Sequence, residues 1–267
     1  MTTFRTHLRQ HPFWVYILLF LFCQLASVPV GLLMARWLEH DQVLVGTLFF
    51  ANALAIIIFL LYCPATITWQ STLGGVRGRG GRRSALVFLL ALPTILLVNL
   101  GQETFFPDIP DLVGAEAMQA LMYHPLGLLT IGVLGPLSEE LLFRGGVQTD
   151  LYRHTVQQGT WVAIALSAAI FALIHLNPAQ MPAAFILGML LGFAYWWTGS
   201  LVASVCIHVF NNSFACVLSL LSPEDDSLIH ILGGPTSAGL MALISLFVLF
   251  LTLRTVRKEV LEGTEDG

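Results

Sequence analysis

Apolar runs long enough to cross a lipid bilayer recur from one end of this chain to the other. Only 10% of the 267 residues are charged, whereas a soluble domain carries about 25%, so a large buried core does not account for this composition. The runs lie at about 13–37, 43–65, 84–101, 126–151, 161–177, 182–198, 201–221 and 237–254. The sequence therefore predicts an all-α fold, a polytopic transmembrane bundle of about eight spans that forms a single membrane-embedded domain over residues 1–267. Pro93 and Pro136 leave open whether their segments are broken or re-entrant.

The basic residues are distributed so that one side of the membrane holds nearly all of them. If the N-terminus is cytoplasmic, ten basic residues fall on the inner side and Arg36 alone falls on the outer side. Cytoplasmic loops are enriched in Lys and Arg, so we expect a multi-pass protein of the cell membrane with both termini in the cytoplasm. The inner residues are Arg5, Arg9, Arg77, Arg79, Arg82, Arg83, Arg153, Arg254, Arg257 and Lys258.

Charge and cysteine usage argue against several other classes of protein. The net charge of −4 gives no electrostatic footprint for nucleic acid, so we expect no nucleic-acid partner. The four cysteines lack C-x-x-C spacing and lie in apolar runs, which is typical of packing residues. The first run has about 25 residues and no obvious small-residue cleavage site, so we expect a retained span instead of a signal peptide. The expected surroundings are therefore the lipid bilayer.

Two adjacent glutamates, Glu139 and Glu140, lie inside the fourth apolar run. A charged side chain at the centre of a membrane costs about 2.5–3.5 kcal/mol on insertion scales, so a pair there needs a function. Adjacent residues on a helix point about 100° apart, and Arg144, four residues beyond Glu140, shares the face of Glu140. We expect Arg144 to pair with Glu140, which leaves Glu139 without a local cation and suited to accept a proton.

Two histidines and an asparagine lie at similar depth in later spans. His175 is at the far end of the fifth run, and His208 and Asn212 are four residues apart on one face of the seventh. At 1.5 Å per residue, these side chains and Glu139 can meet in one polar cavity in the inner half of the membrane. Each of these residues alone has a simpler interpretation as a helix-packing or hydrogen-bonding residue. Likewise, Pro136 alone could mark an ordinary helix kink. Their combination favours contact with water or substrate.

A carboxylate and a histidine that share a water molecule are suited to hydrolysis. His208 and Asn212 could then donate hydrogen bonds to a developing oxyanion. Glu139, His175 and His208 could instead bind zinc, but the H-E-x-x-H spacing of zinc proteases is absent. We therefore expect no required cofactor, with zinc as the alternative.

Three motifs on successive spans carry a family resemblance. Glu139-Glu140-x-x-x-Arg144, Phe171-x-x-x-His175 and His208-x-x-x-Asn212 together resemble the CPBP intramembrane proteases, which include type II CAAX prenyl endopeptidases and Abi proteins. The similarity covers about residues 120–222, the expected protease core. Members are often labelled metalloproteases, although a glutamate-dependent mechanism needs no metal.

The resemblance implies a helical membrane fold with a conical cavity open to the cytoplasmic side, and an endopeptidase activity. It implies that Glu139 and His175 activate water, that His208 and Asn212 bind the oxyanion or support the site, and that Glu140, Arg144 and Phe171 are supporting residues. The expected substrate is a peptide or a membrane protein, prenylated or not. A non-catalytic immunity or scaffold protein, or a transporter that uses the same groups as a proton relay, is the alternative.

Overall fold

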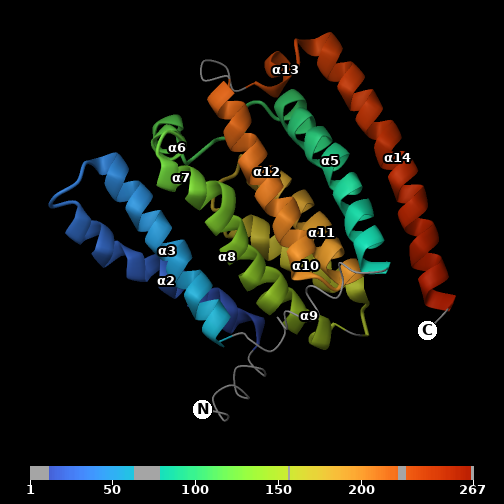
Figure 1. The fold of residues 1–267 in the computed structure, drawn as a ribbon, viewed down its shortest axis with the longest axis horizontal. Helices are drawn as coiled ribbons and strands as arrows, with labels where there is room; N and C mark the ends of the chain where they lie inside the picture. The colour runs from blue at the N-terminus through green and yellow to red at the C-terminus, as the bar shows by residue number, and fades with distance from the viewer. Residues whose placement is uncertain (1–11, 63–78, 156, 222–226, 266–267) are drawn as a thin grey trace.

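The structure is a computed structural model that describes residues 12–62, 79–155, 157–221 and 227–265, and within these ranges it is helical with short connections (Figure 1). This confirms the predicted all-α bundle. The elements are α2 (Phe13–Met34), α3 (His40–Tyr62), α5 (Arg79–Phe105), α6 (Ala115–Met122), α7 (Pro125–Leu129), η1 (Thr130–Leu134), α8 (Gly135–Leu142), η2 (Phe143–Gln148), α9 (Thr149–His154), α10 (Thr160–Leu173), α11 (Met181–Thr198), α12 (Leu201–Leu221), α13 (Leu228–Ile231) and α14 (Pro235–Glu265).

Seven segments of the described chain are long and apolar enough to cross a membrane, one fewer than the eight predicted. The difference is α10, which corresponds to the predicted run 161–177 but has only 14 residues. At 1.5 Å per residue it is about 21 Å long, shorter than the hydrocarbon layer. The helix ends early because Leu176 takes a left-handed φ of 51° and is followed by Asn177-Pro178, which cannot continue the helix. His175 therefore lies just beyond the helix and not within it.

The fourth span, Pro125–His154, is continuous but contains two π-helical stretches, η1 and η2. Such stretches widen a helix by one residue and rotate the side chains that follow, and they are frequent at functional sites. Glu139 and Glu140 lie in the short α-helical section between them. Pro136 is near the start of that section, whereas Pro93 lies within an unbroken α5.

The basic residues gather at one end of the bundle. In Figure 1 the beginning of α5, α9 and the C-terminal end of α14 lie together at this end, which we call the basic face. Arg82 of α5 pairs with Glu259 of α14 at 2.6 Å, and Arg83 donates a hydrogen bond to the carbonyl of Trp197 at the end of α11. This grouping agrees with the predicted orientation, in which the basic face lies in the cytoplasm, but that location stays a prediction. Three of the basic residues, Arg5, Arg9 and Arg77, lie outside the described residues.

Gly188 and Gly192 of α11 allow the helices around the glutamates to approach closely. A Cβ on Gly188 would lie 3.0 Å from the Cβ of Ala168 in α10, and one on Gly192 would lie 2.8 Å from the Oε1 of Gln148. The spacing of four residues is the small-residue pattern of close helix contacts in membranes.

We expect Gly188→Ala to destabilise the protein by about 1–3 kcal/mol, because the added methyl group meets the backbone of α10 and must displace it. The measurement is the free energy of unfolding in a detergent titration. Gly101→Ala is the matched control, since a Cβ there meets no atom within 4 Å. An equal loss of stability in the two variants would contradict the packing role of Gly188.

Candidate functional site

The centre of the site is an ion pair within the fourth span. Arg144 Nη1 lies 2.9 Å from Glu140 Oε1, and both side chains are completely buried. This confirms the predicted pairing of these two residues. A second guanidinium nitrogen of Arg144 donates to the carbonyl of Gly188, 3.0 Å away, and the guanidinium carbon lies 5.1 Å from the centre of the Phe171 ring. Arg144 is thus fixed by α8, α10 and α11 together.

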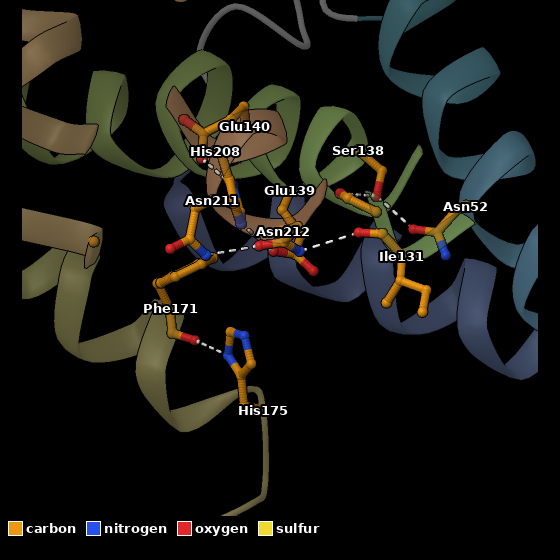
Figure 2. Close-up of polar contacts among 12 residues, drawn as sticks. Asn52, Ile131, Ser138, Glu139, Glu140, Phe171, His175, His208, Asn211 and Asn212 are labelled. Carbon is orange, nitrogen blue, oxygen red and sulfur yellow. Dashed lines mark hydrogen bonds and ion pairs between the residues drawn. The ribbon is translucent and has the colours of Figure 1, made fainter. Parts of the chain in front are cut away.

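His208 of α12 connects the two glutamates (Figure 2). Its Nδ1 lies 2.9 Å from Glu140 Oε1, and its Nε2 lies 3.7 Å from Glu139 Oε2. The ionised Glu140 carboxylate can only accept, so Nδ1 carries a proton and donates it to Glu140. The resemblance implies that His208 binds the oxyanion or supports the site, and in the structure both of its ring nitrogens face carboxylates.

Nε2 of His208 faces Glu139 across 3.7 Å, which is within ion-pair range but too long for a hydrogen bond. The side chains of Arg144, Glu140, His208 and Glu139 therefore form one contiguous polar cluster. Pairing of charged groups within a bundle lowers the cost of placing them in a membrane.

His175 approaches this cluster from the end of α10. Its Nδ1 lies 2.8 Å from the carbonyl oxygen of Phe171, so Nδ1 donates and, in the neutral ring, Nε2 keeps the lone pair. In Figure 2 the imidazole points toward the side chains of Glu139, Asn211 and Asn212. Among the described residues it forms no ion pair with Glu139, whose partner at that range is His208. The side chain of His175 is therefore directed toward Glu139, as predicted, but the two side chains are not in direct contact.

Phe171 separates and positions the two histidines. Its ring is 1% exposed and makes edge-on contacts with His175, at a centroid distance of 4.9 Å, and with His208, at 5.7 Å. The same ring contacts Arg144. Phe171 thus packs against three members of the site, as expected of a supporting residue.

Asn212 is held by the irregular part of the fourth span. Its Nδ2 donates to the carbonyl of Ile131 in η1 at 3.1 Å, and its Oδ1 accepts a hydrogen bond from Asn211 at 3.0 Å. The Asn212 amide has two N–H groups, so the bond to Ile131 leaves one for a substrate. Asn211, which the sequence suggests only as a hydrogen-bond partner and not as a site residue, orients this amide.

The sequence analysis also passed over Gln148 and Asn177. Gln148 is completely buried and donates a hydrogen bond to the carbonyl of Gly192. Arg144 donates in the same way to the carbonyl of Gly188, and in each pair the two residues are 44 positions apart in the sequence. The sequence contained a sign of the role of Gln148, because Glu140, Arg144 and Gln148 recur every fourth residue on one helix face.

Asn177 is 1% exposed and joins the connection after α10 to Asp111 through a hydrogen bond of 2.8 Å. Only the tertiary structure reveals this contact.

The same side chains bear on the alternative of a metal site. Within the described ranges, no group of three His, Cys, Asp or Glu side chains is placed to hold a metal ion. Glu139 and His208 approach each other, but His175 does not complete a ligand set with them. The residues therefore do not fit the predicted zinc ligation in this arrangement.

Comparison with known proteins agrees with the resemblance predicted from the motifs. The family described as "Type II CAAX prenyl endopeptidase Rce1-like" matches residues 122–214, which include every residue of the three motifs. The chain is 32% identical over 104 residues to the membrane-embedded CAAX protease MroQ of Staphylococcus aureus (strain USA300), a match that covers 38% of this chain and 42% of that protein.

A second relative is an uncharacterized 24.3 kDa protein of Escherichia coli, 27% identical over 127 residues, with 46% of this chain and 58% of that protein covered. The chain thus spans about half the length of the curated relatives it matches. No solved structure matches it. Together the matches and the apolar helices indicate an integral membrane protein whose motif-bearing segment is of a membrane protease type.

Proposed function

We propose, from the premise that residues 122–214 belong to the type II CAAX prenyl endopeptidase family, that this chain is an intramembrane endopeptidase. It would hydrolyse a peptide bond of a peptide or membrane-protein substrate with a water molecule activated by glutamate and histidine. The observation that carries the proposal is the cluster of Arg144, Glu140, His208 and Glu139 within that segment.

Glu139 is the proposed general base. Its side chain is 22% exposed, whereas those of Glu140 and Arg144 are 0% exposed, so Glu139 is the member of the cluster that water can reach. In the proposed reaction Glu139 takes a proton from water as the water oxygen bonds to the scissile carbonyl carbon. The proton then passes to the amine that leaves when the C–N bond breaks.

His175 is the proposed partner that orients the water or carries the proton to the amine. Its Nδ1 hydrogen bond to Phe171 fixes the ring and leaves Nε2 able to accept a proton. Because His175 and Glu139 do not touch, a water molecule between them is consistent with the geometry.

His208 and Asn212 are the proposed stabilisers of the oxyanion. Because Nδ1 of His208 donates to Glu140, His208 would donate from Nε2 to an oxyanion only as an imidazolium. Asn212 contributes the N–H that Ile131 does not use. Glu140 and Arg144 support the site because they fix His208. No metal takes part in the proposed reaction. Cleavage assays with and without a chelator distinguish a glutamate mechanism from a metal mechanism.

We expect His175→Ala to lower the rate of cleavage of a quenched membrane-peptide library by about a hundredfold or more, in line with the usual contribution of a general acid or base. The measurement uses the purified full chain in detergent, with and without a chelator. His40→Ala is the matched control, because that side chain is exposed at the start of α3.

The result also separates the alternatives. Activity in His175→Ala equal to that of the wild type would remove His175 from the mechanism, and complete loss with a chelator would favour a metalloprotease. If the wild type cleaves no member of the library, a scaffold or immunity protein becomes the better interpretation.

A further inference from the structure

We propose that Asn177 and Asp111 are positioning residues for His175, because their hydrogen-bonded pair holds the backbone turn that directs the imidazole toward Glu139. The inference rests on the proposed function, in which His175 acts on the water or on the leaving amine. Asp111 lies outside residues 122–214, the segment that matches the family. Half of the pair therefore comes from a part of the chain that the family match does not cover.

The backbone at His175 lacks the regular support of a helix. Helix α10 ends at Leu173, and His175 lies in a turn in which its own N–H donates to the carbonyl of Ala172 at 3.3 Å. The next residue, Leu176, has a φ of 51°, a left-handed conformation that leucine rarely adopts. Such a conformation persists only where the surrounding structure holds it. The side chain of Leu176 is 76% exposed, so the support comes from the residues that follow.

Asn177 supplies this support through both its side chain and its backbone. The side chain is 1% exposed, its amide donates to Asp111 Oδ1 at 2.8 Å, and its oxygen accepts from the backbone N–H of Leu112 at 3.1 Å. The backbone carbonyl of Asn177 accepts from Gln180 and Met181 at the start of α11, at 2.9 and 3.1 Å. The side-chain contacts need a donor and an acceptor together, which asparagine has and aspartate, when ionised, does not.

A second pair of hydrogen bonds joins the same two parts of the chain. The backbone N–H of Ala179 donates to the carbonyl of Pro110 at 3.2 Å, and the side chain of Gln102 in α5 donates to the carbonyl of Ala179. The connection that follows α5 thus holds residues 177–179 at several points. His175 lies in the turn between this anchor and the end of α10, so the anchor determines where its ring lies.

The expected consequence is a loss of kcat. A displacement of about 1 Å in a reacting arrangement can lower the rate by about a hundredfold. The pair of Asn177 and Asp111 holds a group that acts in the proposed reaction, and neither residue is proposed to bind the substrate. Its loss should therefore lower kcat much more than it raises KM.

The test exchanges the donor and the acceptor of the pair. Asn177→Asp places a second carboxylate opposite Asp111, and we expect kcat for a quenched membrane peptide to fall by about 10- to 100-fold with little change in KM. The added change Asp111→Asn returns an N–H donor opposite the new carboxylate and should restore most of the lost kcat. The bond from the backbone N–H of Val113 to Asp111 is exposed, so water can replace it in the double variant. Asp111→Asn alone keeps an acceptor for Asn177 and should retain activity.

A second readout follows the His175 ring without catalysis. Diethyl pyrocarbonate modifies accessible neutral imidazoles, and mass spectrometry of peptides from the full chain in detergent gives the rate for each histidine. We expect Asn177→Asp to raise the rate at the half-buried His175 and to leave the rate at the exposed His40 unchanged, and the double variant to restore the wild-type rate. Equal rates at His175 in the wild type and Asn177→Asp, or no recovery of kcat in the double variant, would overturn the proposal.

Asp111→Ala is the alternative variant if Asn177→Asp fails to fold, because it removes the acceptor from the exposed side of the pair. It should change kcat and the His175 modification rate in the same directions. Asp108→Ala, at an exposed aspartate of the same connection, is the matched control. Wild-type values of both quantities in Asp111→Ala would overturn the proposal. Absence of cleavage by the wild type would instead count against the proposed function, and the modification rates would still decide whether the pair holds His175.

Discussion

Replacement of Glu139 by glutamine is expected to abolish nearly all peptide cleavage while the fold remains intact. A general base contributes about 10²–10⁴ to the rate, and the amide of glutamine cannot take a proton from water. Stability should change little, because glutamine has nearly the size of glutamate, the side chain at this position is partly exposed, and the amide N–H can donate to Nε2 of His208. The measurements are the rate of cleavage and the unfolding midpoint in detergent.

Glu116→Gln is the matched control, since Glu116 is an exposed glutamate of α6. It removes the same charge from the chain without touching the cluster and should retain wild-type activity. Residual activity of Glu139→Gln above a tenth of the wild-type value would contradict the assignment of Glu139 as the base.

The second large effect is expected from Arg144→Met, on stability. The variant leaves Glu140 buried without its guanidinium partner, and breaking a buried pair by removing one member costs about 3–5 kcal/mol. It also removes the hydrogen bond to Gly188 and the stacking on Phe171. We expect a lower free energy of unfolding in a detergent titration and a reduced yield of folded protein.

Arg82→Met is the control for this prediction. Its ion pair with Glu259 is largely exposed on the arginine side, and such pairs contribute about 0–1 kcal/mol. The double variant Glu140→Gln/Arg144→Met should recover part of the loss, because no unpaired buried charge remains. A double variant less stable than Arg144→Met alone would show that the cost does not come from an uncompensated Glu140.

The parts of the site that depend on neighbours in sequence were predictable. The pairing of Glu140 with Arg144 follows from helical spacing, because residues four apart lie on one face. The approach of His208 to Glu139 was expected from their similar depth, but the hydrogen bond of His208 to Glu140 was not, since residues 68 positions apart meet only through the packing of α8 against α12. The length of α10 was overestimated because apolar residues continue to Leu176 with His175 as the one interruption, while the backbone turns at Leu176.

The sequence by itself determined the membrane setting, the helical class and the polar residues that need a function, because the penalty for burying charge in lipid acts on each residue separately. Only the tertiary structure decided which imidazole faces Glu139 and how Asn212 is held. These properties depend on π-helical rotation, on the early end of α10 and on the close approach that Gly188 permits. They are set by packing between distant segments, on which local spacing carries no information.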